Sequence, residues 1–337
     1  MENVSAGTVA SLQSNADKPG ASRQVIASLQ VFLGGASYGV MATTYKLAYA
    51  AGFTSNQVVA GQAWLALALF VLLVLANRAR GKRLAKLGAK TVLKLMGLGM
   101  LTCTTSILYC YAMSVLPAPV ALTLLFQFTW VGLVIQAIAT RRAPHACHII
   151  AAGVIMAGTI VASGLYGTDL GLLDPVGIAC ALGASVSCAL FVTLSGKVPA
   201  DCPPAQRGTI VVAGSALLSL VACPSFLPSG VLFQGFAPYA AIAALFALVF
   251  PVILFGLGAP HLPSGLCTIL SAAELPMGLL VSMIVLGTPM GAREWAGVAT
   301  VLAGVVIAQL PSFASRGAQR SRAYPPNAPI LSGTKSK

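Results

Sequence analysis

The stretch Ser271-Ala272-Ala273-Glu274-Leu275-Pro276 places one carboxylate inside an otherwise apolar run at residues 265–287. An ionised carboxylate at bilayer depth costs at least about 2.5 kcal/mol, so it usually faces a cavity, a partner or a substrate. Pro276 has no N–H and crowds the carbonyl of Ala272, which predicts a kinked helix with that carbonyl oxygen left free. If the run crosses a bilayer, a charge and an exposed backbone acceptor lie one turn apart.

The composition of the whole chain places this run in a membrane. Of its 337 residues, 57% are hydrophobic and only 8% are charged, and the mean hydropathy is +0.88. Soluble domains carry roughly 25% charged residues, so these values predict a polytopic membrane protein. The net charge of +13 does not predict nucleic-acid binding, because the basic residues lie in short loops and the tail and form no single patch.

The cysteines and histidines predict no metal site and no cofactor. The eight cysteines form no CxxC pair and show no Cys/His ligand spacing. Most lie in apolar runs, where cysteine behaves as a small hydrophobe. His145, His148 and His261 lie near predicted helix ends, without carboxylates at ligand spacing. The first 24 residues are polar and mixed in charge, so we expect no cleavable signal peptide.

Ten apolar runs are long enough to span a bilayer, with turn or charge signals between them. The chain is therefore predicted to be an all-α polytopic membrane protein with ten transmembrane helices. The seventh run is the shortest and is followed by Pro224, Pro228 and Gly230. The runs lie at about residues 25–50, 55–76, 92–113, 118–139, 147–166, 175–196, 208–223, 238–258, 265–287 and 294–310.

Lysine and arginine in alternate loops predict how these helices are oriented. Cytoplasmic loops carry the excess of Lys and Arg. The opposite loops hold Arg293 as their only base, with the acids Asp169, Asp174 and Glu294. We therefore expect both termini in the cytoplasm and the protein in the inner (plasma) membrane. The basic set is Arg78, Arg80, Lys82, Arg83, Lys86, Lys90, Lys94, Arg141, Arg142, Lys197, Arg207 and the tail bases Arg316, Arg320, Arg322, Lys335 and Lys337.

An internal repeat relates the two halves at one constant offset of 146 residues. Leu116-Pro117 matches Leu262-Pro263, and Ala157-Gly158 matches Ala303-Gly304. Because five helices separate the copies, the halves are expected to be inverted, as in many secondary transporters. Phe128 is then the counterpart of Glu274. The predicted divisions are a polar cytoplasmic N-terminal segment (1–24), a first repeat (25–166), an external linker (167–174), a second repeat (175–310) and a basic flexible cytoplasmic tail (311–337).

Short motifs follow a fixed order through both halves. They are Tyr109-Cys110-Tyr111-Ala112, Leu116-Pro117-Ala118, Leu124-Leu125-Phe126-Gln127-Phe128-Thr129-Trp130, Gly258-Ala259-Pro260-His261, Ala272-Ala273-Glu274-Leu275-Pro276 and Leu302-Ala303-Gly304. Together they resemble the EamA branch of the drug/metabolite transporter superfamily over about residues 30–310. The resemblance implies a ten-helix carrier of small metabolites, amino acids or drugs, often outward. Its substrate path would be lined by the first, third, fourth, sixth, eighth and ninth helices. Thr288 departs from the pattern, since many relatives have Glu there.

Glu274 is the leading candidate for a functional residue. It is suited to bind a cationic group of a substrate, or to carry a proton that couples transport to a gradient. The alternative is a neutral buried carboxyl with only a structural task. Ser271 lies in a polar stripe on the same helix, and Glu274 flanks that stripe.

Gln127 and Trp130 share one face of the predicted fourth helix with Thr123. Gln127 can donate and accept hydrogen bonds, and Trp130 offers an aromatic wall with one N–H, so both suit a substrate cavity. Polar contact between helices explains the same residues equally well. Both interpretations therefore stay open.

Tyrosines and a lysine complete the predicted cavity. Tyr109 lies on a polar face of the third helix, and Tyr38 lies deep in the first. Tyr45 and Tyr49 lie nearer a membrane end and fit an interfacial aromatic belt. Lys46, about one turn from the outer end of the first helix, can snorkel to the surface, pair with Glu274 or meet an anionic substrate.

Pro276 and Pro251 interrupt predicted helices and are candidate hinges, although such kinks also serve packing alone.

The sequence favours a secondary carrier over two other classes. An intramembrane enzyme needs a nucleophile and base or a metal, and no GxSxG, HExxH or His/Asp cluster lies in the apolar runs. A non-transporting scaffold fits inverted repeats with an unpaired buried acid poorly. We expect alternating access, no catalytic residue, a small-molecule substrate, contact with the lipid bilayer and a monomer or weak homodimer.

Overall fold

The computed structural model describes residues 21–116, 118–163, 173–198, 202–287 and 289–323. Within these ranges the secondary structure is helical, with no strand. Eight helices are long and apolar enough to cross a membrane, and Ala146–Ala162 is a shorter apolar helix. The prediction of an all-helical chain with many apolar, membrane-length helices is confirmed. The predicted segments 1–24 and 167–174 lie largely outside the described residues. Of the predicted flexible tail 311–337, residues 311–323 are helical and continue α15, and the rest lies outside the described residues.

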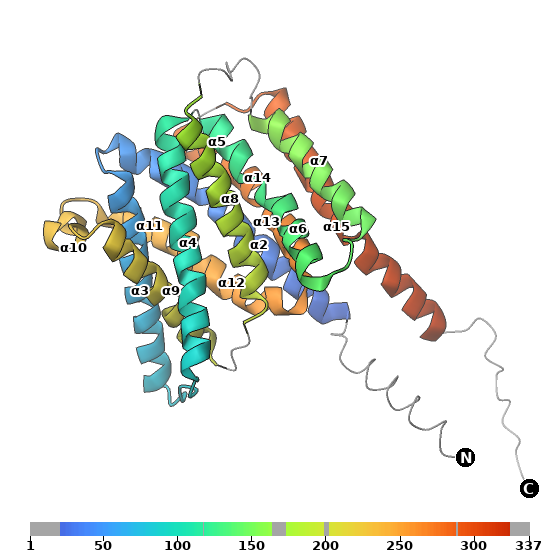
Figure 1. Ribbon diagram of the computed structural model, residues 1–337, viewed down its shortest axis with the longest axis horizontal. Helices are drawn as coiled ribbons and strands as arrows, with labels where there is room; N and C mark the ends of the chain where they lie inside the picture. The colour runs from blue at the N-terminus through green and yellow to red at the C-terminus, as the bar shows by residue number, and fades with distance from the viewer. Residues whose placement is uncertain (1–20, 117, 164–172, 199–201, 288, 324–337) are drawn as a thin grey trace, which may run out of the picture.

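The first half contains three long helices, one broken helix and one shorter helix (Figure 1). Thr54 begins the second of these with a capping box, because its side chain accepts from Gln57 N while Gln57 Oε1 accepts from Thr54 N at 2.8 Å. The elements are α2 (Ala21–Ala50), α3 (Ser55–Ala79), α4 (Ala89–Val115), α5 (Ala118–Leu125), α6 (Phe128–Thr140) and α7 (Ala146–Ser163).

The second half is interrupted more often. Asp174 caps its first helix by accepting from Val176 N at 3.3 Å and Gly177 N at 3.0 Å. A π-helical turn, η3, directly precedes Pro251. The elements are α8 (Pro175–Ser195), α9 (Pro204–Ala222), α10 (Phe226–Ser229), η2 (Val231–Phe233), α11 (Ala237–Ala243), η3 (Ala244–Val249), α12 (Phe250–Gly258), η4 (Ala259–His261), α13 (Ser264–Ser271), α14 (Glu274–Leu286) and α15 (Ala292–Ala323).

Two helices are broken at corresponding places. The dipeptide Phe126-Gln127 separates α5 from α6, and Ala272-Ala273 separates α13 from α14. All four helix bounds of the first pair recur in the second pair 146 residues later. The residues after α6 and α14, Arg141 and Gly287, also share the left-handed conformation, with φ of 51° and 66°.

The expectation of a free Ala272 carbonyl is wrong. Leu275 N donates to Ala272 O at 3.3 Å, and Met277 N donates to Ala273 O at 3.3 Å. The tighter turn supplies an i+3 donor in place of the missing N–H of Pro276, so the break leaves this acceptor satisfied. Glu274, in turn, becomes the first residue of α14.

Helix packing places α2 against the second break. α2 lies beside α12, α13 and α14, α4 lies beside α8 and α9, and α7 and α15 form a pair at one side of the molecule (Figure 1). A Cβ on Gly39 would lie 2.5 Å from Gly278 N and 2.6 Å from Glu274 O. Because no side chain fits at that distance, glycine is what allows α2 to approach the start of α14.

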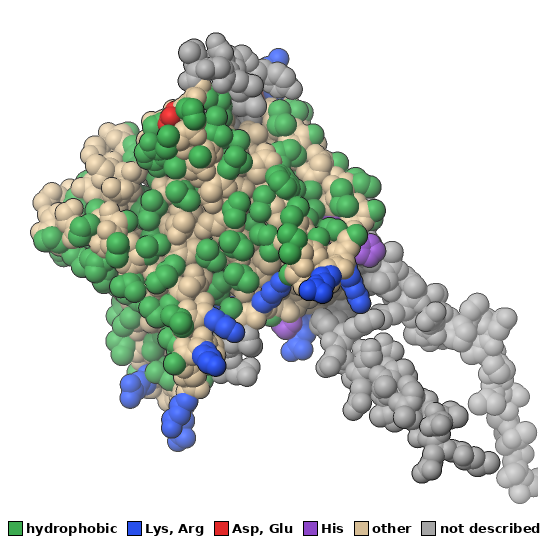
Figure 2. All heavy atoms as spheres, in the orientation of Figure 1, with side chains coloured by type: hydrophobic (Ala, Val, Ile, Leu, Met, Phe, Trp, Pro, Cys, Tyr) green, Lys and Arg blue, Asp and Glu red, His purple; other side chains and the backbone are tan. Residues whose placement is uncertain are grey.

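The surface has an apolar middle and a basic end. Figure 2 shows hydrophobic side chains over the helices and Lys and Arg side chains toward the lower end. Ile138, Val221 and Ile284 are 73%, 74% and 76% exposed. Apolar exposure on this scale in a helical bundle fits contact with lipid hydrocarbon. The basic end holds the connection between α3 and α4, so α2 and α4 end on the opposite side.

Candidate functional site

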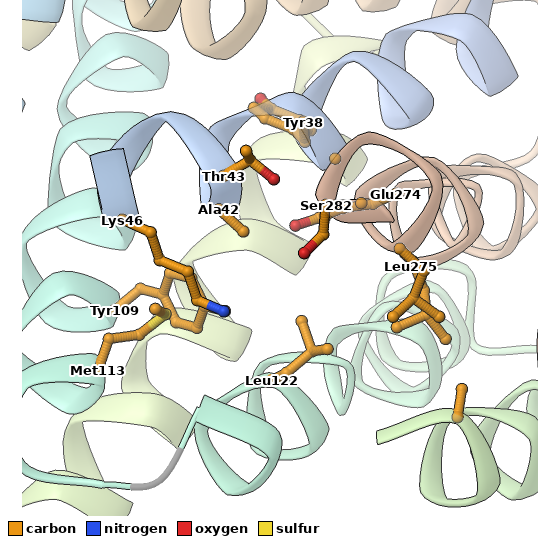
Figure 3. Close-up of a pocket in the computed structure, with 14 residues that line it drawn as sticks. Tyr38, Ala42, Thr43, Lys46, Tyr109, Met113, Leu122, Glu274, Leu275 and Ser282 are labelled. Carbon is orange, nitrogen blue, oxygen red and sulfur yellow. The ribbon is translucent and has the colours of Figure 1, made fainter. Parts of the chain in front are cut away.

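A cavity of about 230 Å³ lies among α2, α4, α5, α7 and α14 (Figure 3). Helices α2 and α14 supply most of its wall. Its lining residues are Tyr38, Gly39, Ala42, Thr43, Lys46, Tyr109, Met113, Leu122, Ala162, Glu274, Leu275, Gly278, Leu279 and Ser282. Lys46, Met113 and Ser282 lie near the ends of their helices that are opposite the basic end. The cavity therefore extends toward the non-basic side of the molecule.

A smaller cavity of about 50 Å³ adjoins the larger one. Tyr38, Ala42, Tyr109 and Glu274 line both. The smaller cavity adds residues of α4 that lie closer to the basic end, with Cys188, Phe191, Ala247 and two other side chains from neighbouring elements. The added α4 residues are Thr102, Thr105 and Ser106. Glu274 thus lies where a larger cavity from one side meets a smaller cavity toward the other.

Within the described part of the chain, the Glu274 carboxylate has no hydrogen-bond partner and forms no ion pair. Tyr38 on α2 and Tyr109 on α4 border the same space from the facing helices. An intramembrane acid normally pairs with a charge or a backbone carbonyl, or faces a water-filled cavity. Glu274 faces a cavity, so its carboxylate can bind a cation or a proton from that space.

Lys46 also faces the larger cavity. Figure 3 shows its side chain directed into the space from α2, with Glu274 across the cavity on α14. Lys46 is exposed, and it forms no ion pair with Glu274. The structure therefore brings four predicted residues to one cavity: Glu274, Tyr38, Tyr109 and Lys46.

Three other predicted site residues lie outside both cavities. Gln127 Nε2 donates to Thr123 O at 3.2 Å and to Met156 Sδ at 3.3 Å, and Trp130 Nε1 donates to Gln127 Oε1. Trp130 is 46% exposed, whereas Ser271 is 2% exposed and donates to Cys267 O at 2.8 Å. The break at Phe126-Gln127 directs Gln127 toward α7, which contains Met156.

The interfacial-belt expectation is wrong for Tyr45. Its ring is 1% exposed, and its hydroxyl donates to Gln62 Oε1 at 2.7 Å. Gln62 Nε2 in turn donates to Ser106 Oγ at 3.2 Å. This buried polar chain joins α2, α3 and α4 beside the smaller cavity, because Ser106 lines that cavity.

Sequence reasoning missed Thr43, which is 3% exposed and lines the larger cavity. Its position could have been predicted from the sequence, because Thr43 lies three residues before Lys46 and two helical residues at this spacing share one face.

The two predicted hinges occupy different surroundings. Pro251 is buried and follows η3, whose Ala247 lines the smaller cavity. Pro276 is buried in the first turn of α14, where a missing N–H removes no interior helical bond. Pro251 therefore interrupts a continuing helix, and Pro276 starts a new one.

Direct contacts join neighbouring helices at the basic end of the bundle. Arg207 is 8% exposed and donates to Val198 O at 3.1 Å and Ser195 O at 2.6 Å, which joins α9 to the end of α8. Gln136 Oε1 on α6 accepts a hydrogen bond from Gly265 N on α13. A Cβ on Gly258 would lie 2.7 Å from Ala27 O, so α12 and α2 also meet closely there.

The described residues contain no group of three or more His, Cys, Asp or Glu side chains that could hold a metal ion.

Comparisons with known proteins bear on the fold. No family model matches the chain, and no curated protein matches it. A solved structure described as "Crystal structure of protein" is similar, with a TM-score of 0.64 and 16% sequence identity, covering 85% of this chain and 98% of that chain. At that identity the likeness shows the fold alone. Fold and cavity together define a helical protein of membrane-spanning type with an internal cavity that contains an acid.

Proposed function

We propose that the chain is a secondary active transporter that moves a small metabolite, amino acid or drug-like solute across the inner membrane. The observation that carries the proposal is the position of Glu274. Its carboxylate lies at a helix break, between two cavities, without a charge partner among the described residues. Such an acid defaults to a role in a substrate or ion path, and broken helices near the midplane are typical of carrier binding sites.

Ten helices in two inverted repeats are part of this proposal. In it, α7 and α15 are the fifth and tenth spans, beside the eight long apolar helices. The constant offset of 146 residues between the broken helices supports the repeat. The packing is also consistent with the repeat. In it, α4 corresponds to α12 and α8 corresponds to α2, and both pairs, α4 with α8 and α12 with α2, are in contact. Membership of the EamA branch rests on the sequence resemblance and is proposed on that ground.

The difference between the two ends supports alternating access as the mechanism of this proposal. The larger cavity extends toward the non-basic side, whereas the Arg207 and Gln136 contacts join neighbouring helices at the basic end. Since cytoplasmic loops carry the excess of Lys and Arg, this arrangement would face outward, with both termini cytoplasmic. Transport would then require the basic-end contacts to open while the cavity closes on the other side. We propose no catalytic activity and no cofactor.

Proton coupling at Glu274 is the finer hypothesis. A carboxyl group that faces alternate sides of a membrane can bind a proton on one side and release it on the other. The test is flux in proteoliposomes with an imposed pH gradient, using a defined mixture of amino acids, nucleosides and cationic drugs read by mass spectrometry. We expect wild type to move at least one component, and Glu274→Gln to abolish the response to the pH gradient.

The matched control is Glu294→Gln in α15, because it makes the same chemical change outside both cavities. Flux through this control should equal that of wild type. The coupling hypothesis fails if Glu274→Gln retains wild-type flux and the same pH response. Absence of flux for every component in wild type would contradict the transporter proposal itself.

A further inference from the structure

The wall of the larger cavity carries a second polar position, away from Glu274. Thr43 and Lys46 lie three residues apart on α2 and therefore share a face of that helix. Thr43 is 3% exposed, and its Oγ1 has no hydrogen-bond partner in the structure. Figure 3 shows the Thr43 hydroxyl and the Lys46 side chain both directed into the cavity. A buried hydroxyl without a partner beside a cation is suited to receive an anionic group.

Lys46 and Glu274 are held apart on neighbouring helices. Gly39 marks the level of Glu274 along α2, because its Cβ position meets Glu274 O and Gly278 N. Lys46 lies seven residues further along α2, which corresponds to a rise of about 10 Å at 1.5 Å per residue. The two side chains form no ion pair. The cavity thus keeps a negative and a positive group at separate depths.

Apolar side chains make up much of the remaining wall. Leu122 on α5 and Leu275 and Leu279 on α14 line the cavity. An extended ligand would therefore place hydrocarbon against these leucines while its ends meet opposite charges. A short molecule with adjacent charges could contact the level of Glu274 or the level of Lys46, but it could not contact both.

We propose that Lys46 and Thr43 form an anion subsite, and that the cavity binds a dipolar solute whose ammonium and anionic groups are separated by an apolar spacer. The ammonium lies at Glu274, the anionic group at Lys46 and Thr43, and the spacer along the leucines. This assignment rests on the proposed function, because it treats the same cavity as the substrate site.

Thermal stabilisation of the purified full-length protein tests the assignment, since a ligand of the native state raises apparent stability by mass action. The probes are ε-aminocaproate, hexylamine, hexanoate and glycine. We expect ε-aminocaproate to bind at least about tenfold more tightly than hexylamine or hexanoate, the gain that one charge-assisted contact supplies. Glycine, whose charges are adjacent, should show no such gain. If ε-aminocaproate shows no gain over both single-charge probes, the assignment is overturned.

Lys46→Met should remove the gain of ε-aminocaproate over hexylamine and leave hexylamine binding unchanged. The matched control is Lys197→Met, which neutralises an exposed lysine at the basic end and should retain the gain. A gain that survives Lys46→Met overturns the subsite.

A second measurement needs no bound solute. Thr43→Cys, built with Cys188→Ser because Cys188 lines the smaller cavity, is treated with methanethiosulfonates bearing a sulfonate or a trimethylammonium group. We expect faster reaction with the anionic reagent, and loss of that preference when Lys46→Met is added. Equal rates for the two reagents overturn the subsite. Transport is judged separately, because absence of flux in proteoliposomes with the binding gain intact contradicts the transporter and leaves the dipolar site standing.

Discussion

The break between α5 and α6 and the break between α13 and α14 share one backbone form and hold different chemistry. Phe128 begins α6 and is 0% exposed, with its ring 5.6 Å from that of Phe126 between centroids. Glu274 begins α14 at the matching position and faces two cavities. The same main-chain turn is therefore filled in one half and open in the other. The two breaks therefore share a backbone form, while the acid that faces the cavities is present at the second break alone.

The largest expected effect on stability comes from removing the Phe128 ring at the break between α5 and α6. Phe128→Ala removes a fully buried ring, so we expect the free energy of unfolding to fall by about 3–5 kcal/mol. Glu274→Ala enlarges an existing cavity and should change the same quantity by less than about 1 kcal/mol. Chemical unfolding in detergent measures both. Equal losses for the two variants would break the comparison, because they would make Glu274 a packing residue.

In the proposed transporter, copying the first break into the second should strongly reduce flux without unfolding the protein. Glu274→Phe fills the meeting point of the cavities and removes the charge. Flux should fall by about 10- to 100-fold or more, since one charged contact is worth about 1.5–3 kcal/mol. Flux in proteoliposomes and the elution volume of the purified protein are the measurements. A variant that elutes as wild type and transports normally would remove Glu274 from the path.

The contact that positions the second break should tolerate no side chain. Gly39→Ala places a Cβ 2.5 Å from Gly278 N, so we expect a loss of about 1–3 kcal/mol of unfolding free energy from overpacking. Ser185 stands 146 residues after Gly39 on α8, is fully buried and has an unpartnered hydroxyl. Ser185→Ala should therefore be neutral or slightly stabilising. Similar costs at both positions would contradict the asymmetry.

The smallest expected effect concerns the basic end. Gln136→Ala removes the acceptor of Gly265 N and should cost about 1 kcal/mol. We expect Cys188, which lines the smaller cavity, to react faster with a water-soluble maleimide in this variant. The labelling rate, with Cys188→Ser as the blank, is the measurement. An unchanged rate would show that this hydrogen bond does not hold the basic end closed.

The sequence predicts the helices better than it predicts which side chains meet. Apolar length and intervening charges depend on local composition, so the sequence predicts an all-helical chain with many apolar helices, and eight of those in the described residues are long enough to span a membrane. Glu274 stands out because it is an acid in an apolar run. Gln127 and Trp130 do share a face, because Trp130 Nε1 donates to Gln127 Oε1. That face lies against Met156 of α7 and outside both cavities. Tyr45 is buried, and its hydroxyl donates a hydrogen bond to Gln62 Oε1 on another helix. Such contacts between helices leave no periodic signal within either one.

Gly39 and Gly278 have a consequence for engineering selectivity. Both line the larger cavity without a side chain, so part of its wall is bare peptide backbone. A methyl group added at Gly39 would lie 2.5 Å from Gly278 N, whereas one added at Gly278 would lie 3.3 Å from Gly39 O. In the proposed transporter, the backbone at Gly39 is therefore a constant part of the site, and a change of solute is expected to come from facing side chains such as Met113, Leu122 and Leu279.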